Sequence, residues 1–496
     1  MYQLVSPEIQ KWIVLAVFVL VFALVLYRKV PIYILSLSAA AILILLGIVH
    51  PGTALSQYIS WDVLAIYLGY GVLSVALQES NLPKAIADWI LPRLRKEKYA
   101  LLFLCSLAAA LSSFMPNPVV VLMLAPLAIE MAERLKGSLF LYLIGLAIAS
   151  NVVTTVSMVA DPPSIILAME TNMSFLDFYW FKGRPGLGTL SVVGVLAALS
   201  TLMFQFRKLN NTVDVAVEGV VVSRASKIVF GSGIAVSILA VGLSTFELRV
   251  PALIVLGAWS LFTAVLHRVE HSGTPDKSKK QGSTALRLTL GASALFVLSV
   301  VALALVPNER PPGVLGYLNY LGWVGIVVGI FAAVLLGRKW KGAVKEQDWL
   351  TIVFLMGIFI VIGAVDQVGL LKDFASWMTG AGFTNPILVF SIITWLSVAL
   401  SSFIDNVPYT VLMIPVCSYL AQTLGISPFY LYFGMLVGTG IGGNITPVGA
   451  TANVLACGML EKRGHKIELG RYMKISIPFS CVAVLAVQIL VQVFWG

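Results

Sequence analysis

The heptapeptide LSSFMPN at residues 111–117 returns as LSSFIDN at residues 400–406, and each copy interrupts a long apolar stretch. Pro116 and Pro118 flank the asparagine of the first copy, and Pro408 follows that of the second. Proline stops a helix because it lacks a backbone N–H donor and clashes with the preceding turn. Each copy therefore predicts two helices joined by a short polar break.

The similarity between the two stretches continues well beyond the heptapeptide. Pairs matched at an offset of 289 residues (406 − 117), or 288 further upstream, include Pro126 and Pro415, Gly145 and Gly434, and Trp61 and Trp349. Apolar similarity alone does not align tryptophan, proline and glycine in one register. The pattern predicts two repeats, at residues 11–206 and 286–495, joined by a linker at residues 207–285 that carries two extra spans.

Composition indicates a bilayer environment. The chain is 59% hydrophobic and only 11% charged, with a mean hydropathy of +0.94, whereas soluble domains carry about 25% charged residues. Runs of spanning length occupy residues 12–27, 30–48, 61–78, 140–159, 187–206, 228–245, 252–266, 286–306, 314–337, 349–365, 429–443 and 475–495. With interrupted stretches at 101–135 and 388–424, they predict an all-α polytopic membrane protein of about 12 spans plus two re-entrant hairpins.

Basic residues give a predicted orientation. Connections such as residues 93–98, 338–341 and 462–466 are rich in Lys and Arg, which favour the cytoplasmic side. All basic clusters fall inside if both hairpins re-enter and both termini lie outside. The two repeats then have inverted topology, and inverted repeats place a binding site at their interface near mid-membrane. We expect the plasma membrane as the location.

The two breaks and two further polar segments carry the candidate site. Residues 151–163 and 440–453 mix glycine, proline, hydroxyls and amides inside apolar spans, which is typical of unwound segments that coordinate ions. Broken helices also offer free N–H and C=O groups to a ligand. The candidate substrate- or ion-binding residues are Ser112, Ser113, Asn117, Asn151, Thr155, Ser157, Ser401, Ser402, Asp405, Asn406, Asn444, Thr446 and Asn453.

Asp405 stands out because it is a carboxylate at a predicted mid-membrane tip, where an ionisable residue is functional by default. We expect Asp405, Asn406 and Asn444 to bind Na⁺, or Asp405 to carry a proton. The first repeat has Pro116 at the equivalent position, so the main cation site is predicted in the second half and the substrate pocket is completed by the first. Asp161, which precedes Pro162, fits either a helix N-cap or an ion ligand.

These segments resemble the ion transporter superfamily, which includes citrate and dicarboxylate symporters, arsenite-efflux permeases and bacterial Na⁺/H⁺ antiporters. The resemblance rests on DNVP at residues 405–408, GNITPVGATAN at 443–453 and DPPSII at 161–166, and it covers most of the chain. It implies a citrate-transporter-like fold, a homodimer and alternating access. By this resemblance, cation- or substrate-site roles fall to Asn117, Asn151, Thr155, Asn406, Asn444 and Thr446.

The favoured functional hypothesis is a secondary active transporter in which Na⁺ or H⁺ movement drives an anion or oxyanion, such as a carboxylate. A Na⁺/H⁺ antiporter and an arsenite or antimonite efflux permease remain alternatives. The net charge of +10 lies in short connections and does not indicate a nucleic-acid partner. No HExxH motif occurs and the four histidines lie in or beside predicted loops, so we expect no enzymatic activity. No GxxxxGK[ST] loop occurs either, so we do not expect ATP bound within this chain to supply the energy. The expected partners are a small ion and the lipid bilayer, with no cofactor beyond the coupling ion.

Overall fold

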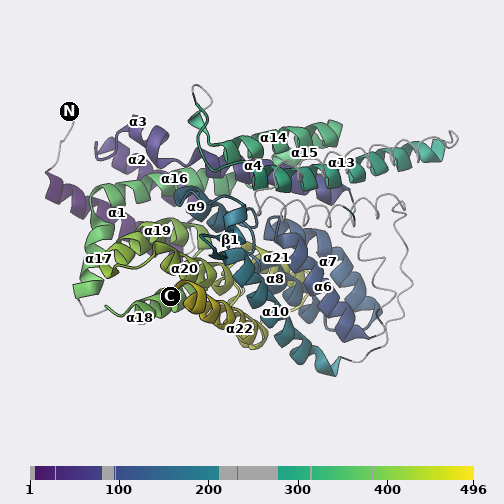
Figure 1. Ribbon diagram of the computed structural model, residues 1–496. Helices are drawn as coiled ribbons and strands as arrows, with labels where there is room; N and C mark the ends of the chain where they lie inside the picture. Colours follow the sequence, from purple (N-terminus) through teal and green to yellow (C-terminus); the bar gives the residue numbers. More distant parts are fainter. Residues whose placement is uncertain are drawn as a thin grey trace.

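The computed structural model describes residues 6–27, 30–80, 96–209, 277–312, 316–380 and 384–496, with positions 94, 211 and 232 between them. Long helices form an upper layer in Figure 1. This layer holds α1 (Pro7–Tyr27), α2 (Ile32–Leu45), α4 (Trp61–Glu79), α13 (Lys277–Leu305), α14 (Tyr320–Leu336) and α16 (Trp349–Gln367). Four short elements accompany them: α3 (Pro51–Thr53), η1 (Ala54–Tyr58), η6 (Gly337–Lys339) and α15 (Trp340–Lys345).

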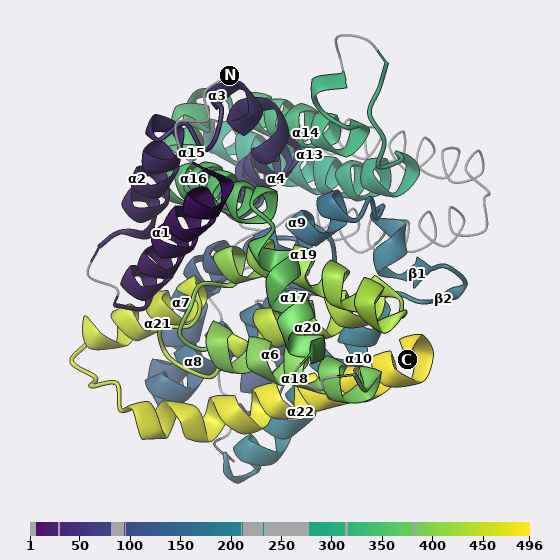
Figure 2. The ribbon, with the colours of Figure 1, turned by 90° about the vertical axis from the view of Figure 1, so that its left-hand side faces the viewer.

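The remaining helices form a second layer beneath the first, and the view in Figure 2 preserves this separation. From the first half come α6 (Glu97–Ser112), α7 (Asn117–Arg134), α8 (Leu139–Asn151), α9 (Pro162–Glu170) and α10 (Leu187–Gln205). From the second half come α18 (Pro386–Ser401), α19 (Asn406–Leu424), α20 (Pro428–Gly442), α21 (Thr451–Glu461) and α22 (Leu469–Trp495). Minor elements are α17 (Leu370–Gly380), η3 (Leu176–Phe178), η4 (Phe206–Lys208) and a hairpin of β1 (Trp180–Phe181) and β2 (Arg184–Pro185).

Among the described residues, six helices are long and apolar enough to cross a membrane. They are Trp61–Glu79, Leu187–Gln205, Tyr320–Lys345, Trp349–Gln367, Asn406–Leu424 and Leu469–Trp495. The predicted run 314–337 begins too early: α14 starts at Tyr320 because the side chain of Asn319 accepts a hydrogen bond from Gly322 N and caps the helix. The predicted linker spans, 228–245 and 252–266, lie outside the described residues.

The predicted helix breaks are confirmed. Four residues separate α6 from α7 and α18 from α19, and longer non-helical segments separate α8 from α9 and α20 from α21. Because α7 begins at Asn117 and α19 at Asn406, the two asparagines occupy the same position in their hairpins. The prolines at these starts fit the first turn, where no N–H donor is required.

In the upper layer, two close helix crossings join the two halves, because each pairs a helix of the first half with a helix of the second. Helix α4 packs on α14, and α2 packs on α16. A Cβ atom added at Gly69 would lie 1.8 Å from the Gly325 carbonyl oxygen, and one added at Gly357 would lie 2.6 Å from the backbone of Ser36. Small residues allow such backbones to approach in the absence of a hydrophobic driving force between helices.

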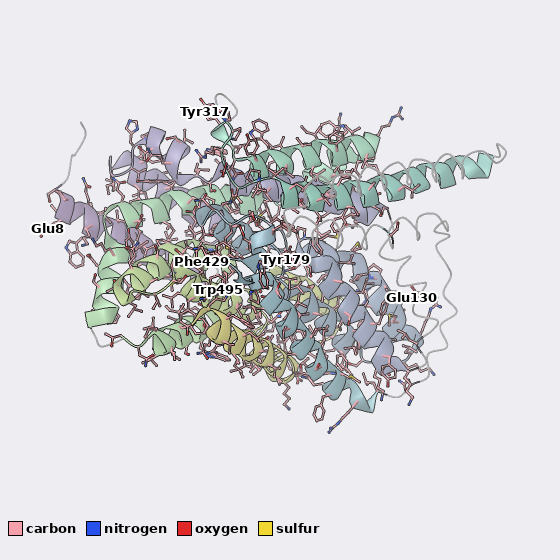
Figure 3. The ribbon with its side chains drawn as sticks, in the orientation of Figure 1. Glu8, Glu130, Tyr179, Tyr317, Phe429 and Trp495 are labelled. Carbon is pink, nitrogen blue, oxygen red and sulfur yellow. The ribbon has the colours of Figure 1, made fainter. Side chains whose placement is uncertain are left out.

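The end of α22 is fastened to the short β-hairpin. Trp495 Nε1 donates to the Pro185 carbonyl oxygen over 2.9 Å, and Arg184 donates to the Phe494 carbonyl over 2.8 Å. The ring of Phe433 lies 5.0 Å from that of Trp495 in an edge-to-face arrangement. Figure 3 labels Trp495 and Phe429 close together near the middle of the view, and their ring centroids lie 6.2 Å apart. These contacts fix the C-terminal end of α22 against the β-hairpin formed by β1 and β2.

Candidate functional site

Each hairpin tip is bonded to the unwound segment of its own half. The Ser157 hydroxyl donates to the Ser113 carbonyl oxygen in the first half. The Thr446 hydroxyl makes the equivalent bond to the Ser402 carbonyl oxygen in the second. A carbonyl at a broken helix end needs such a donor because hydrocarbon offers none. Two matching hydrogen bonds therefore join each hairpin tip to the unwound segment of its own half.

A chain of amide side chains links the two halves. Asn117 Nδ2 donates to Asn151 Oδ1 over 2.9 Å, and Asn151 Nδ2 donates to Asn444 Oδ1 over 3.2 Å. Asn444 Nδ2 in turn donates to the Ile148 carbonyl oxygen over 3.0 Å. All three asparagines are buried. One hairpin tip and both unwound segments therefore belong to a single polar network, and Asn151 is its centre.

The second hairpin tip satisfies its own polar groups differently. Ser401 Oγ lies 2.5 Å from Asn406 Oδ1 and 2.6 Å from the Thr439 carbonyl oxygen, so one hydroxyl proton serves two acceptors. The Ser402 hydroxyl donates to Val398 O over 2.8 Å. Asp405 accepts a hydrogen bond from Val407 N over 3.1 Å and caps α19. The Asp405 carboxylate thus also stabilises the start of the second half-helix.

Three predicted residues lie at the edge of this arrangement. Thr155 bonds Ser191 of α10 over 2.7 Å, so its hydroxyl is directed to the neighbouring helix. Asn453 Nδ2 donates to the Gly443 carbonyl oxygen over 3.0 Å and supports the unwound segment from α21. The Ser112 hydroxyl is buried without a partner among the described residues. None of these three residues lines the cavity described next.

A cavity of about 70 Å³ opens where the two halves meet. Its wall includes Asn117, Asn151, Asp161, Asp405 and Asn406. Further lining residues are Tyr67, Pro116, Pro118, Pro162, Asp348, Thr351, Val407, Gly449, Ala450, Thr451 and Ala452. No Lys, Arg or His occurs among them. The cavity is therefore lined by carboxylates, amides and hydroxyls, which are oxygen ligands suited to hard cations.

The sequence prediction left the role of Asp161 open between a cap and a ligand. Asp161 does occupy the N-cap position of α9, yet its side chain makes no capping hydrogen bond. Its carboxylate faces the cavity and interacts with Asp405 and with the Asn406 side chain. Asp161 therefore belongs with the site residues, and the Asp-Pro-Pro sequence concealed this because it is also a helix-start pattern.

Tyr67, Asp348 and Thr351 were not predicted as site residues. Asp348 caps α16, because its carboxylate accepts bonds from Thr351 N over 3.1 Å and from Thr351 Oγ1 over 2.5 Å. An Asp three residues before a Thr at a helix start signals this cap but not its position at a cavity wall. A lone tyrosine in an apolar helix such as α4 gives no signal at all.

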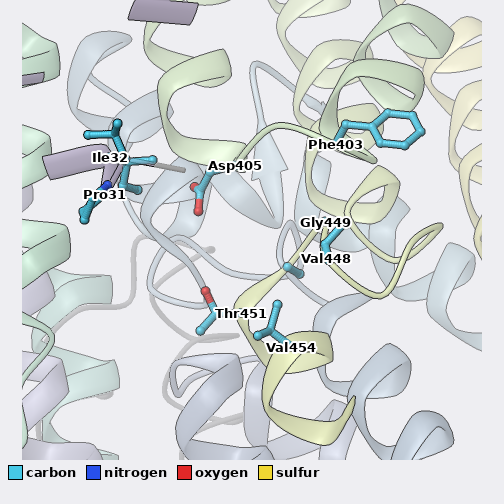
Figure 4. Close-up of a pocket in the computed structure, with 10 residues that line it drawn as sticks. Pro31, Ile32, Phe403, Asp405, Val448, Gly449, Thr451 and Val454 are labelled. Atoms are coloured by element: carbon cyan, nitrogen blue, oxygen red, sulfur yellow. The ribbon is translucent and has the colours of Figure 1, made fainter. Parts of the chain in front are cut away.

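A second and larger cavity, of about 400 Å³, shares part of this wall. Asp405, Gly449, Ala450 and Thr451 line both spaces. Figure 4 shows the Asp405 carboxylate and the Thr451 hydroxyl in this pocket, with Pro31 and Ile32 on its other side and the Phe403 ring turned away. Asp405 thus lies between a small polar cavity and a wider space that can hold a small organic ion.

Comparison with known proteins places this geometry in a family. A family model described as citrate transporter matches residues 22–438. The P protein of Homo sapiens is 26% identical over 96% of this chain, which spans 59% of that longer protein. An uncharacterized transporter of Mycobacterium tuberculosis is 24% identical, with 95% of this chain and 96% of the relative covered.

A solved structure supports the same fold. The YdaH transporter of Alcanivorax borkumensis aligns with a TM-score of 0.53 and 15% identity, covering 93% of this chain and 96% of its own. That likeness concerns the fold alone, whereas the family model covers most of the sequence. With its apolar helices and broken-helix site, the chain belongs to the citrate transporter family and is an integral membrane transporter.

Proposed function

We propose that this protein is a secondary active transporter in which the movement of Na⁺ or H⁺ drives a carboxylate-like anion or oxyanion across the membrane. The observation that carries the proposal is the convergence of both hairpin tips and both unwound segments on one polar cavity lined by Asp161 and Asp405. Broken helices that line a cavity are a common construction of ion and substrate sites in transporters.

Electrostatics favours coupling to a cation. An anion entering a wall with three carboxylates, those of Asp161, Asp348 and Asp405, and no basic side chain would be repelled. Two like charges about 5 Å apart repel by roughly 3 kcal/mol at an effective dielectric constant of about 20. A co-bound cation or proton removes this penalty, so anion binding would depend on the coupling ion. The wider cavity beside Asp405 offers room for the organic substrate.

Alternating access would follow from two inverted repeats that move relative to each other. Equivalent hydrogen bonds at Ser157 and Thr446, and helix starts at equivalent positions, support the repeat. Both termini are proposed to lie outside the plasma membrane, which the accessibility of terminal tags to an impermeant reagent tests. A cytoplasmic location of either tag would contradict this orientation.

Flux measurements in proteoliposomes test the function. Purified protein is reconstituted, an inward Na⁺ or H⁺ gradient is imposed, and uptake of radiolabelled citrate, dicarboxylates and sulfate is followed. We expect uptake that collapses when an ionophore dissipates the gradient. Asn406→Ala should lose this uptake, while Asp373→Asn, a change at an exposed ion pair with Lys11, should retain it. Uptake of none of these anions under either gradient would sink the proposal.

The carboxylate pair itself favours one second candidate, a Na⁺/H⁺ antiporter, because Asp161 and Asp405 suffice to exchange two cations without an anion. A pH-sensitive dye inside the same vesicles distinguishes the two. Proton efflux driven by Na⁺ without any anion present identifies the antiporter. Arsenite efflux has less support, since no cysteine occurs among the described residues that line the two cavities.

A further inference from the structure

We infer that Lys182 and Arg471 are positioning residues of the candidate site. Each holds the start of a buried helix that belongs to the other half of the chain, and so fixes the unwound segment into which that helix leads. The inference goes beyond the proposed function, because it concerns what holds the site in place and does not depend on which ions the site binds.

The first contact joins the β-hairpin to α20. The Lys182 ammonium nitrogen lies 4.6 Å from the centroid of the Phe429 ring. Lys182 occupies the turn between β1 and β2 in the first half, whereas Phe429 is the second residue of α20 in the second half. The Phe181 ring packs edge-on against that of Phe429, with centroids 4.7 Å apart. A cation within about 6 Å of a ring centroid is attracted by the negative face of the ring.

The second contact joins α22 to α8. The Arg471 guanidinium carbon lies 4.4 Å from the centroid of the Phe140 ring. Arg471 is the third residue of α22 in the second half, and Phe140 is the second residue of α8 in the first. The guanidinium also donates to the Ser138 hydroxyl oxygen over 3.4 Å at the start of α8. In both contacts, here called the clasps, the cation and the ring come from different halves.

The two clasps are related by the internal repeat. The rings of Phe140 and Phe429 are separated by 289 residues (429 − 140), and so are Lys182 and Arg471 (471 − 182). This is the offset that matches the two hairpin asparagines. A single Lys or Arg over a ring is ordinary, since such contacts occur about once per 70–80 residues. That frequency does not explain two contacts in which both partners keep the register of the repeat.

The clasped helices carry no charge of their own. Helices α8 and α20 contain no Lys, Arg, Asp or Glu, and most of their side chains are buried. Charged and aromatic groups at the ends of a helix set its position in a membrane, so these two helices depend on cations from other elements. A cation beside the first turn opposes the helix dipole, whose positive end lies there. The rings of Phe140 and Phe429 therefore supply the attraction.

The clasps lie at opposite ends of α22 and act on the site from both sides. Arg471 is in the first turn of this helix, whereas the β-hairpin that carries Lys182 is bonded to Trp495 in the last. Figure 2 shows the β-hairpin and the C-terminus on the same side of the molecule. Helix α8 ends at Asn151, and Asn444 follows the end of α20 by two residues. An axial shift of either helix therefore moves an asparagine of the amide network.

Hydrogen exchange of the purified full chain, measured by mass spectrometry, tests the clasps without any substrate. Arg471→Met removes the charge and keeps a long apolar side chain. Because local opening governs exchange, we expect amide exchange at residues 152–160 to become about threefold faster and exchange at residues 443–450 to change less. Lys182→Met should produce the opposite pattern. Arg471→Lys and Lys182→Arg should restore the wild-type rates, because either cation is attracted to the ring.

Two further variants keep the test decisive. Arg207→Met removes a cation that lies 4.0 Å from the nearby Phe204 ring and joins no two halves, so it should leave both unwound segments unchanged. Phe140→Leu removes the ring in place of the cation, and should speed exchange in the first-half segment even if Arg471→Met does not fold. Equal acceleration of both segments by each clasp variant would indicate a general loss of stability and would overturn the inference.

Unchanged exchange in the clasp variants would overturn it as well, as would failure of the Lys and Arg replacements to restore the rates. None of these outcomes depends on gradient-driven anion flux, so the inference and the proposed function can fail separately.

Discussion

The two hairpin tips use the same asparagine in opposite ways. In the first half, Asn117 commits its amide nitrogen to Asn151 and leaves its oxygen without a partner among the described residues. In the second, Asn406 commits its oxygen to Ser401, and the neighbouring Asp405 provides the charge. The two repeats therefore share the backbone break but differ in the polar groups that they offer to a ligand. Only the break depends on proline and helix geometry.

The largest effect on transport should come from the position at which the second tip has Asp405 and the first has Pro116. Asp405→Ala removes a carboxylate that lines both cavities, whereas Pro116→Ala changes the equivalent first-half residue, which carries no charge. We expect Asp405→Ala to reduce gradient-driven flux by about 100-fold, the equivalent of about 3 kcal/mol, because it leaves the opposed groups of the site without their partner. Pro116→Ala should retain most of the flux. Comparable losses in the two variants would remove the functional asymmetry between the tips.

The helix crossings offer a comparison that depends on packing alone. A Cβ at Gly69 would meet the Gly325 carbonyl oxygen at 1.8 Å, closer than the 2.6 Å between a Cβ at Gly357 and the Ser36 backbone. Overpacking against backbone costs about 1–3 kcal/mol. We expect Gly69→Ala to lower the thermal midpoint in detergent more than Gly357→Ala. Gly342→Ala, where nothing lies within 4 Å, serves as the control. The reverse ranking would contradict the geometry of the two crossings.

The sequence predicted the breaks well because they depend on local chemistry. Pro116 directly precedes α7, Pro118 and Pro408 lie in the first turns of α7 and α19, and both helices begin where the pattern placed them. Asn151 as the centre of the amide network depends on three-dimensional contacts with Asn117 and Asn444, which no local pattern encodes.

Asp161 shows most clearly which site residues cannot be predicted from sequence. Its sequence context is that of a helix cap, and it does occupy the N-cap position, but it makes no capping bond. Only the approach of the other half, which brings Asp405 and Asn406 to it, makes it a site residue. The late start of α14 has a similar origin, because Asn319 caps the helix while its backbone N–H donates to Asp62 over 2.7 Å.

Removing the contacts that anchor the C-terminal end of α9 should lower stability by an intermediate amount. Asn308, in the segment after α13, donates to the Ala168 and Met173 carbonyl oxygens over 3.1 and 2.9 Å at the end of this helix. Asn308 Oδ1 also accepts a bond from Asn319 Nδ2 over 2.6 Å. Loss of these three buried bonds, at about 1 kcal/mol each, should make Asn308→Ala about 3 kcal/mol less stable.

The measurement for Asn308→Ala is the thermal midpoint with and without Na⁺. Because Asp161, which lines the polar cavity, lies at the opposite end of α9, a loosened helix should also reduce the stabilisation that the proposed coupling ion Na⁺ provides. Leu20→Ala, which removes an exposed side chain from the interior of α1, provides the control. Equal destabilisation by both would show that the Asn308 contacts do not anchor α9.

The smallest effects should come from the hydroxyls that make the same bond in both halves. Ser157→Ala and Thr446→Val each remove the donor to a tip carbonyl, of Ser113 and Ser402 respectively, and each should cost about 1 kcal/mol of stability. The two carbonyls end equivalent helices, so the losses should agree within error, and the thermal midpoints of the two variants measure this directly. Flux should fall in parallel with stability if these bonds only support the tips. A selective loss of Na⁺ affinity in Ser157→Ala, with Thr446→Val unaffected, would instead indicate that the first-half tip holds the ion more tightly, because the Asn117 oxygen has no hydrogen-bond partner among the described residues whereas the Asn406 oxygen accepts a bond from Ser401.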